Sequence, residues 1–168
     1  MKKFDKKTQI KILKIILIVA WMAIVFSFSN QGGTKSGNTS RKVTEAVVQV
    51  ISDKPIEENE QLIEKVDKVI RKLAHYTIYT IGGFLIMNYA YATVRKPKEK
   101  IIYSILFGAG YAVTDELHQF FVAGRSARIF DVGIDTLGVA TGVLMYLIIR
   151  NVINIISTKL QRRNLQEV

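Results

Sequence analysis

Four long apolar runs constrain the fold of this chain more than any other feature of its sequence. They occupy residues 10–28, 73–91, 101–120 and 132–149. Each approaches the roughly 20 residues that an α-helix, rising about 1.5 Å per residue, needs to cross a hydrocarbon core about 30 Å thick. The runs are apolar nearly all round, whereas helices of a soluble bundle alternate apolar and polar faces. The sequence therefore predicts an all-α polytopic membrane protein with four transmembrane helices, forming a single domain over residues 1–168.

Basic residues are distributed unevenly between the segments that flank these runs. The chain carries 24 Lys and Arg against 14 Asp and Glu. With the N-terminus inside, fourteen of the bases but only three of the acids fall in the inner segments, namely the tails at about 1–10 and 151–168, the turn at 95–100 and the adjoining ends of the spans. This positive-inside pattern explains the basicity without a nucleic-acid partner. It predicts a multi-pass protein of the bacterial cell membrane with both termini in the cytoplasm.

Targeting and cysteine chemistry are constrained by two further features. A Lys-rich start before an apolar run is typical of a secretory signal, but three more runs follow, so we expect an uncleaved signal anchor. The chain contains no cysteine. Disulfides, thiolate nucleophiles and Cys-ligated metals are therefore excluded.

The first outer loop contains two amphipathic segments. Apolar residues recur at helical spacing in its first part, at Val43, Ala46, Val47, Val50 and Ile51. This pattern predicts a short helix that lies on the outer interface or on the bundle. Pro55 is expected to start a second helix, whose apolar stripe over residues 62–73 continues into the second span. In the spans themselves, Gly138 with Gly142, and Gly108 with Gly110, favour close helix packing.

Ionisable and polar residues gather where three of the spans meet the outer side. Such groups are costly at the ends of membrane helices unless they face a partner, a cavity or a substrate. The candidates for catalysis lie at the end of the third span: Asp115, Glu116 and His118. The candidates for ligand binding come from all three spans and the last outer loop: Arg71, Lys72, His75, Tyr79, Gln119, Arg125, Asp131 and Asp135. The competing interpretation is a structural network of ion pairs and interfacial anchors.

Two kinds of chemistry suit this set of residues. Two imidazoles with nearby carboxylates could hold a divalent metal such as zinc or manganese and activate water, although no HExxH motif is present. Alternatively, Arg71, Lys72 and Arg125 could clamp a phosphate while His118 or Asp115 moves a proton. The second arrangement would fit a phospholipid or polyprenyl-phosphate head group.

The motifs of this set resemble those of the VanZ-like family of small bacterial membrane proteins. The similarity covers about residues 15–150, and its specific part is the block Asp-Glu-x-His-Gln at 115–119 with a downstream Gly-Arg and Asp. Further matching residues are Arg71, Lys72, His75, Tyr79, Tyr111, Gly124, Arg125, Asp131, Gly138 and Gly142. The resemblance implies a four-helix integral membrane protein, and the family takes its name from a member associated with resistance to the glycopeptide teicoplanin. It implies no reaction or cofactor.

We therefore expect a protein that binds or acts on a cell-envelope lipid or glycolipid head group at the outer leaflet. Its partners would be membrane lipids. The main alternative is a non-enzymatic binder or modulator that alters antibiotic access to the cell surface. A small transporter is disfavoured, because the ionisable groups lie at one depth instead of spanning the bilayer.

Overall fold

The computed structural model describes residues 5–30, 33–52, 59–122 and 128–166, and this part of the chain is all-α. Its helices are α1 (Lys6–Ser29), α2 (Gly33–Ile51), α3 (Glu60–Thr93), α4 (Pro97–Phe120) and α5 (Ile129–Gln166). The predicted all-α class is confirmed. α3 runs without a break from the outer-loop segment through the second apolar run, as predicted. The helix start expected at Pro55 lies outside the described residues.

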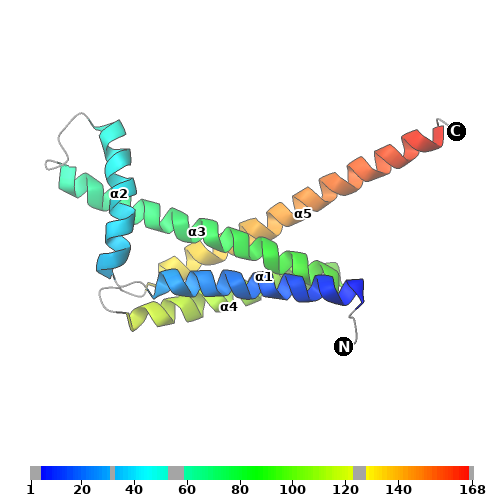
Figure 1. Cartoon of the computed structure of the whole chain (residues 1–168), viewed down its shortest axis with the longest axis horizontal. Coiled ribbons are helices and arrows are strands. Elements are labelled where there is room, and N and C mark those ends of the chain that lie inside the picture. Colours follow the sequence, from blue (N-terminus) through cyan, green and yellow to red (C-terminus); the bar gives the residue numbers. More distant parts are fainter. Residues whose placement is uncertain (1–4, 31–32, 53–58, 123–127, 167–168) are drawn as a thin grey trace.

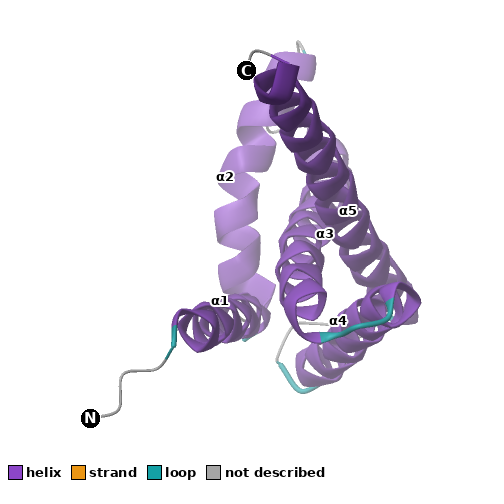
Figure 2. Ribbon diagram, turned by 90° about the vertical axis from the view of Figure 1, so that its right-hand side faces the viewer, coloured by secondary structure: helices purple, strands orange, loops and turns teal. Residues whose placement is uncertain are grey.

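α3 is the central helix, and it contacts each of the other four. In the end-on view of Figure 2 it lies between α1 on one side and α4 and α5 on the other. The end of α1, the end of α4 and the start of α5 lie together at one end of the bundle, where α2 stands across α3 (Figure 1). This arrangement brings the three predicted polar segments to the same end.

Large apolar side chains cover much of the outer surface. In α1 only Ile18, Trp21, Val25 and Ser29 are buried, while residues such as Leu13, Ile16 and Val19 are more than half exposed. By length and composition, two described helical stretches could cross a membrane, Lys6–Ser29 and Ile129–Asn164. α3 and α4 carry more polar side chains within their apolar runs, so four spans stay a prediction. Surfaces this apolar are unusual in monomeric soluble proteins and are consistent with a membrane protein.

Glycines set the close approach of α3 and α5. A Cβ atom at Gly142 would lie 1.9 Å from the carbonyl oxygen of Thr80, and one at Gly138 would lie 2.5 Å from that of Tyr76. Both glycines therefore touch the α3 backbone directly. Gly108 of α4 packs on Val139 of α5 in a similar way, whereas a Cβ at Gly110 would meet nothing within 4 Å. The close packing predicted from these glycines is confirmed, except at Gly110.

Two aromatic residues, the buried Trp21 and the partly buried Tyr111, tie α1 to the rest of the bundle. The Trp21 indole donates a hydrogen bond to the carbonyl oxygen of Ile78 at 2.8 Å. The Tyr111 hydroxyl donates one to the carbonyl oxygen of Met22 at 2.6 Å. Large aromatic side chains suit such contacts, since they bury apolar area while their polar atoms find partners. These contacts fix α1 against α3 and α4.

α2 packs on α3 through Thr44 and Val48, and its predicted apolar stripe is not the face that makes this contact. Thr44 and Val48 are buried, whereas Val50 is 85% exposed and Ile51 60% exposed. Arg41 pairs with Glu45 of its own helix and with Glu60 of α3, and these carboxylates raise the pKa of the guanidinium above its usual value. The predicted stripe therefore points away from the bundle and forms an exposed apolar surface on α2.

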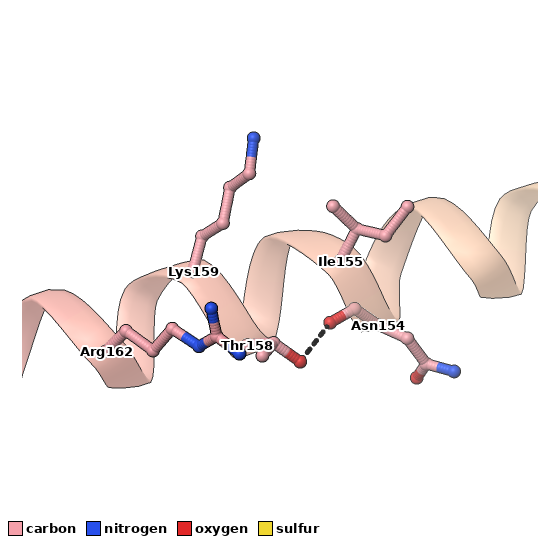
Figure 3. A pocket seen from close by; sticks show the side chains of 5 residues that line it. All are labelled: Asn154, Ile155, Thr158, Lys159 and Arg162. Carbon is pink, nitrogen blue, oxygen red and sulfur yellow. Dashed lines mark hydrogen bonds between the residues drawn. The ribbon is translucent and has the colours of Figure 1, made fainter.

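The C-terminal half of α5 projects beyond the other helices (Figure 1). All residues from 151 to 164 are exposed. Figure 3 shows a shallow hollow on this projection, lined by Asn154, Ile155, Thr158, Lys159 and Arg162 of consecutive helical turns. Its one drawn hydrogen bond runs within the helix, from the Thr158 hydroxyl to the carbonyl oxygen of Asn154. A single helix forms this hollow, so it does not make an enclosed site.

Candidate functional site

Three helices contribute one acid or imidazole each to a compact group, which we call the triad: His75 of α3, Asp115 of α4 and Asp135 of α5. One side-chain nitrogen or oxygen atom of each lies within 4.8 Å of those of the other two. Asp115 is 4% exposed and Asp135 only 1%. Two carboxylates and an imidazole thus face one another in the interior of the bundle.

Helix packing explains why these side chains meet. Gly138 lies three residues after Asp135 on the same helix. It contacts the backbone of Tyr76, the neighbour of His75. This close approach places the start of α5 directly against the His75 turn of α3. On α4, the buried Ala112 precedes Asp115 by about one turn, and side chains three residues apart lie on one helix face. Small residues therefore let three polar side chains share a space that larger side chains would fill.

The contacts within the triad leave part of its bonding capacity unused. The His75 Nδ1 atom lies 3.5 Å from the Asp135 Oδ2 atom, which makes an ion pair when the imidazole is protonated. Gln119 donates a hydrogen bond from its Nε2 atom to the Asp115 Oδ2 atom at 3.0 Å. The other oxygen of Asp135 is buried without a hydrogen-bond partner among the described residues. Buried carboxylate oxygens are normally paired, so this one calls for an explanation.

Tyr79 lies one turn beyond His75 and closes the inner side of the triad. It is 0% exposed, and its hydroxyl interacts electrostatically with both Asp115 and Asp135. No hydrogen bond of acceptable geometry to that hydroxyl forms within the described part of the chain. Trp21 packs against the Tyr79 ring at a centroid distance of 5.7 Å. Tyr79 therefore connects the triad to the aromatic contacts with α1.

Two of the predicted cationic residues, Arg71 and Lys72, sit outside the triad and have carboxylate partners of their own. Arg71 pairs with Asp67 at 2.5 Å. Lys72 lies 3.3 Å from Asp131 and 4.7 Å from the centre of the Phe130 ring. Arg125 lies outside the described residues. Asp67 was missed by the sequence argument, although its i,i+4 spacing to Arg71 is a recognisable signal for an ion pair.

Glu116 and His118 have surroundings that differ from those of the triad. A Glu116 oxygen accepts a hydrogen bond from the backbone N–H of Arg128, just before α5 begins, where a carboxylate is favoured by the helix dipole. The His118 ring packs on Phe26 of α1 with a centroid distance of 4.6 Å, and its Nε2 atom is buried without a hydrogen-bond partner in the described segments. The structure thus brings only one of the two histidines to the triad. The catalytic roles of Glu116 and His118 stay predictions.

The triad offers one imidazole nitrogen and two carboxylate oxygens, a donor set that suits zinc or manganese. Without a metal, the same groups could share and transfer a proton between imidazole and carboxylate. Both kinds of chemistry need a ligand to reach the end of the bundle where α4 ends and α5 begins. There, the ion pairs of Arg71 and Lys72 lie close in sequence to the triad.

Comparisons with known proteins bear on the family of this chain. No curated protein and no solved structure matches it. The model of the VanZ/LLP1 family matches residues 14–150. That range contains the three triad residues and every other residue of the predicted site. The chain therefore belongs to the VanZ/LLP1 family.

Proposed function

We propose that this protein is a four-span membrane protein that binds or acts on a cell-envelope lipid or glycolipid head group at the outer leaflet. The observation that carries the proposal is the clustering of His75, Asp115 and Asp135, with both carboxylates buried, where three helices meet. Ionisable groups held inside a membrane protein usually mark a functional site. Structural stapling of helices alone does not require two facing carboxylates.

The opposite end of the bundle supports the proposed orientation. Lys14 donates a hydrogen bond to the carbonyl oxygen of Asn88. Lys100 and Arg150 both lie over the ring of Tyr91, at 3.9 and 3.7 Å. Basic and aromatic side chains of this kind anchor the cytoplasmic boundary of membrane proteins. The triad would then face the outer leaflet, with both termini in the cytoplasm of a bacterial cell.

The exposed apolar stripe of α2 suits a helix that lies at the outer membrane–water interface. Its apolar stripe is exposed, with Val50 and Ile51 the most exposed, and α2 lies at the end of the bundle where α1 and α4 end and α5 begins (Figure 1). Amphipathic helices bury such a stripe at the boundary between head groups and acyl chains. A lipid head group beside α2 would then lie at the depth of the triad.

The charged residues around the triad suit a phosphorylated head group. Arg71 and Lys72 are each about 40% exposed in their side chains, so both can exchange a carboxylate partner for a lipid phosphate. Arg binds phosphate bidentately, while Lys acts as a point charge. The triad would then sit beside the bound phosphate, where Asp115 or His75 could transfer a proton. Binding without turnover is the alternative, and it uses the same residues.

A comparison of envelope lipid pools by mass spectrometry separates the two alternatives. The cells to compare lack the gene or express wild-type protein, Asp115→Asn or the matched control Glu64→Gln, which changes an exposed acid on α3. An enzyme should change the pool only in the wild-type and control cells. A binder should leave the pool unchanged while teicoplanin susceptibility follows the same pattern. If neither the pool nor the susceptibility depends on the protein, the proposed function is wrong.

A further inference from the structure

We infer that the triad of His75, Asp115 and Asp135 is a binding site for a divalent cation of the zinc or manganese type. The inference uses only the geometry and chemistry of these side chains, so it stands or falls independently of the head-group proposal. It also differs from the two-histidine arrangement expected from the sequence, because His118 packs on Phe26 instead. The site would join α3, α4 and α5 at their outer ends.

The spacing of the donor atoms is close to what one ion requires. Zinc bonds to histidine nitrogen and carboxylate oxygen are about 2.0–2.2 Å long, so two donor atoms of a tetrahedral site are about 3.4 Å apart. The three donor atoms lie within 4.8 Å of one another. Side-chain rotations that move each atom by less than about 1 Å would bring them into a common coordination shell. No movement of the helices is needed.

The charge balance of the triad favours a cation. Two carboxylates, both at least 96% buried, face each other, and the only ion pair that the described residues give either of them is the contact from His75 to Asp135. Arg71 and Lys72 pair with Asp67 and Asp131 instead. Burying carboxylates without compensating charge is costly. A divalent ion neutralises both carboxylates and uses the neutral form of the imidazole.

Two neighbouring side chains, Tyr79 and Gln119, lie next to the triad and could support a bound ion. The Tyr79 side chain is wholly buried, and its hydroxyl interacts with both Asp115 and Asp135 without a hydrogen bond of normal geometry among the described residues. It could donate to a ligand carboxylate or to a water on the ion. Gln119 holds Asp115 through its 3.0 Å hydrogen bond. Such outer contacts fix the orientation of metal ligands and are typical of metal sites.

Three protein ligands leave at least one coordination position open, as in catalytic rather than structural zinc sites. A bound cation would change the triad from an anionic pocket into one that attracts a phosphate oxygen. This last step rests on the proposed function. The cation itself does not.

The test uses the full chain purified in detergent and stripped with EDTA. Trp21 is the only tryptophan, and its ring is 5.7 Å from that of Tyr79, so it reports on the triad. We expect Mn²⁺ to quench Trp21 fluorescence saturably at about one ion per chain, with reversal by EDTA. Titration calorimetry with Zn²⁺ should give the same stoichiometry. Absence of saturable binding of both ions to the folded wild-type protein would overturn the inference.

Variants then locate the ion. His75→Gln and Asp135→Asn should each weaken Mn²⁺ and Zn²⁺ binding by more than tenfold, while circular dichroism shows the same helix content. Glu64→Gln should leave both affinities within about twofold, and so should His118→Gln. Equal affinities in wild type and Asp135→Asn, or loss only in His118→Gln, would move the ion elsewhere and refute the assignment. If the triad variants do not fold, labelling of wild-type imidazoles with diethyl pyrocarbonate replaces them: Zn²⁺ should protect His75, whose side chain is 29% exposed, and equal labelling of His75 with and without Zn²⁺ would refute the site.

Cation binding without any change in lipids or antibiotic response would contradict the proposed function while leaving this inference intact. A protein-dependent lipid change with no saturable cation binding would contradict this inference and leave the proposed function intact.

Discussion

Adding one methyl group at Gly142 should force α3 and α5 apart. The new Cβ would lie 1.9 Å from the carbonyl oxygen of Thr80 and 2.7 Å from the backbone nitrogen of Phe84, where ordinary contact begins at 3.4 Å. The shortfall to Thr80 is therefore 1.5 Å, and both obstructing atoms belong to the backbone of a helix. No side-chain rotation can relieve such a clash.

The size of the effect follows from two opposing terms. Overpacking of a close contact costs about 1–3 kcal/mol, and a clash with backbone belongs at the upper end of that range. Replacing Gly by Ala within a helix returns about 1 kcal/mol through helix propensity. We therefore expect Gly142→Ala to lose about 2 kcal/mol of stability. For a chain of this length that corresponds to a fall in unfolding temperature of about 4–8 °C.

Gly110 provides a matched control, since a Cβ there meets nothing within 4 Å. Gly110→Ala should keep the helix-propensity gain of about 0.5–1 kcal/mol and raise the unfolding temperature slightly. The assay is thermal unfolding in one detergent, followed by circular dichroism and by Trp21 fluorescence. A Gly142→Ala protein as stable as wild type, or an equal loss in both variants, would refute the packing argument.

Three other substitutions test single contacts. Gln119→Ala removes the hydrogen bond to Asp115 and should weaken cation binding by about 10–100-fold with little change in helix content; unchanged binding in calorimetry would show that Gln119 does not orient the ligand. Tyr111→Phe removes the bond to the Met22 carbonyl and should lower stability by about 1 kcal/mol, seen as a fall of a few degrees in unfolding temperature, whereas an unchanged temperature would contradict it. Asp67→Asn weakens the ion pair and the Thr44 contact beneath α2, so limited trypsin digestion should cut α2 after Arg41 or Lys42 faster than in wild type; equal cleavage rates would argue against that anchoring role.

The sequence predicted the helices well, because long apolar runs and their flanking charges depend only on local composition. It also predicted that Gly138 and Gly142 mark a close helix contact. The stripe of α2 was identified correctly as apolar, but its direction was not determined, because Thr44 and Val48 make the contact with α3. Which face of an amphipathic helix packs inward depends on its partner helix, so the sequence of that helix alone does not determine its packing face.

The candidate site was predicted in part. Topology alone placed His75, Asp115 and Asp135 at one end of the bundle. It could not show that His118 faces α1, because residues three apart share one broad side of a helix but still differ by about 60° in direction. That difference is enough to separate Asp115, which faces α3 and α5, from His118, which contacts Phe26. Crossing angles between helices decide such cases, and they follow from packing over the whole bundle.

The central claim is that the triad opens toward the outside of the cell. Because the chain lacks cysteine, single-cysteine variants report on one position each. Arg128→Cys lies in an exposed position next to the start of α5, and Lys98→Cys lies in an exposed position at the opposite end of the bundle. A membrane-impermeant thiol reagent should label Arg128→Cys in intact cells and label Lys98→Cys only after the membrane is opened. Equal labelling of both positions in intact cells, or the reverse pattern, would contradict the account.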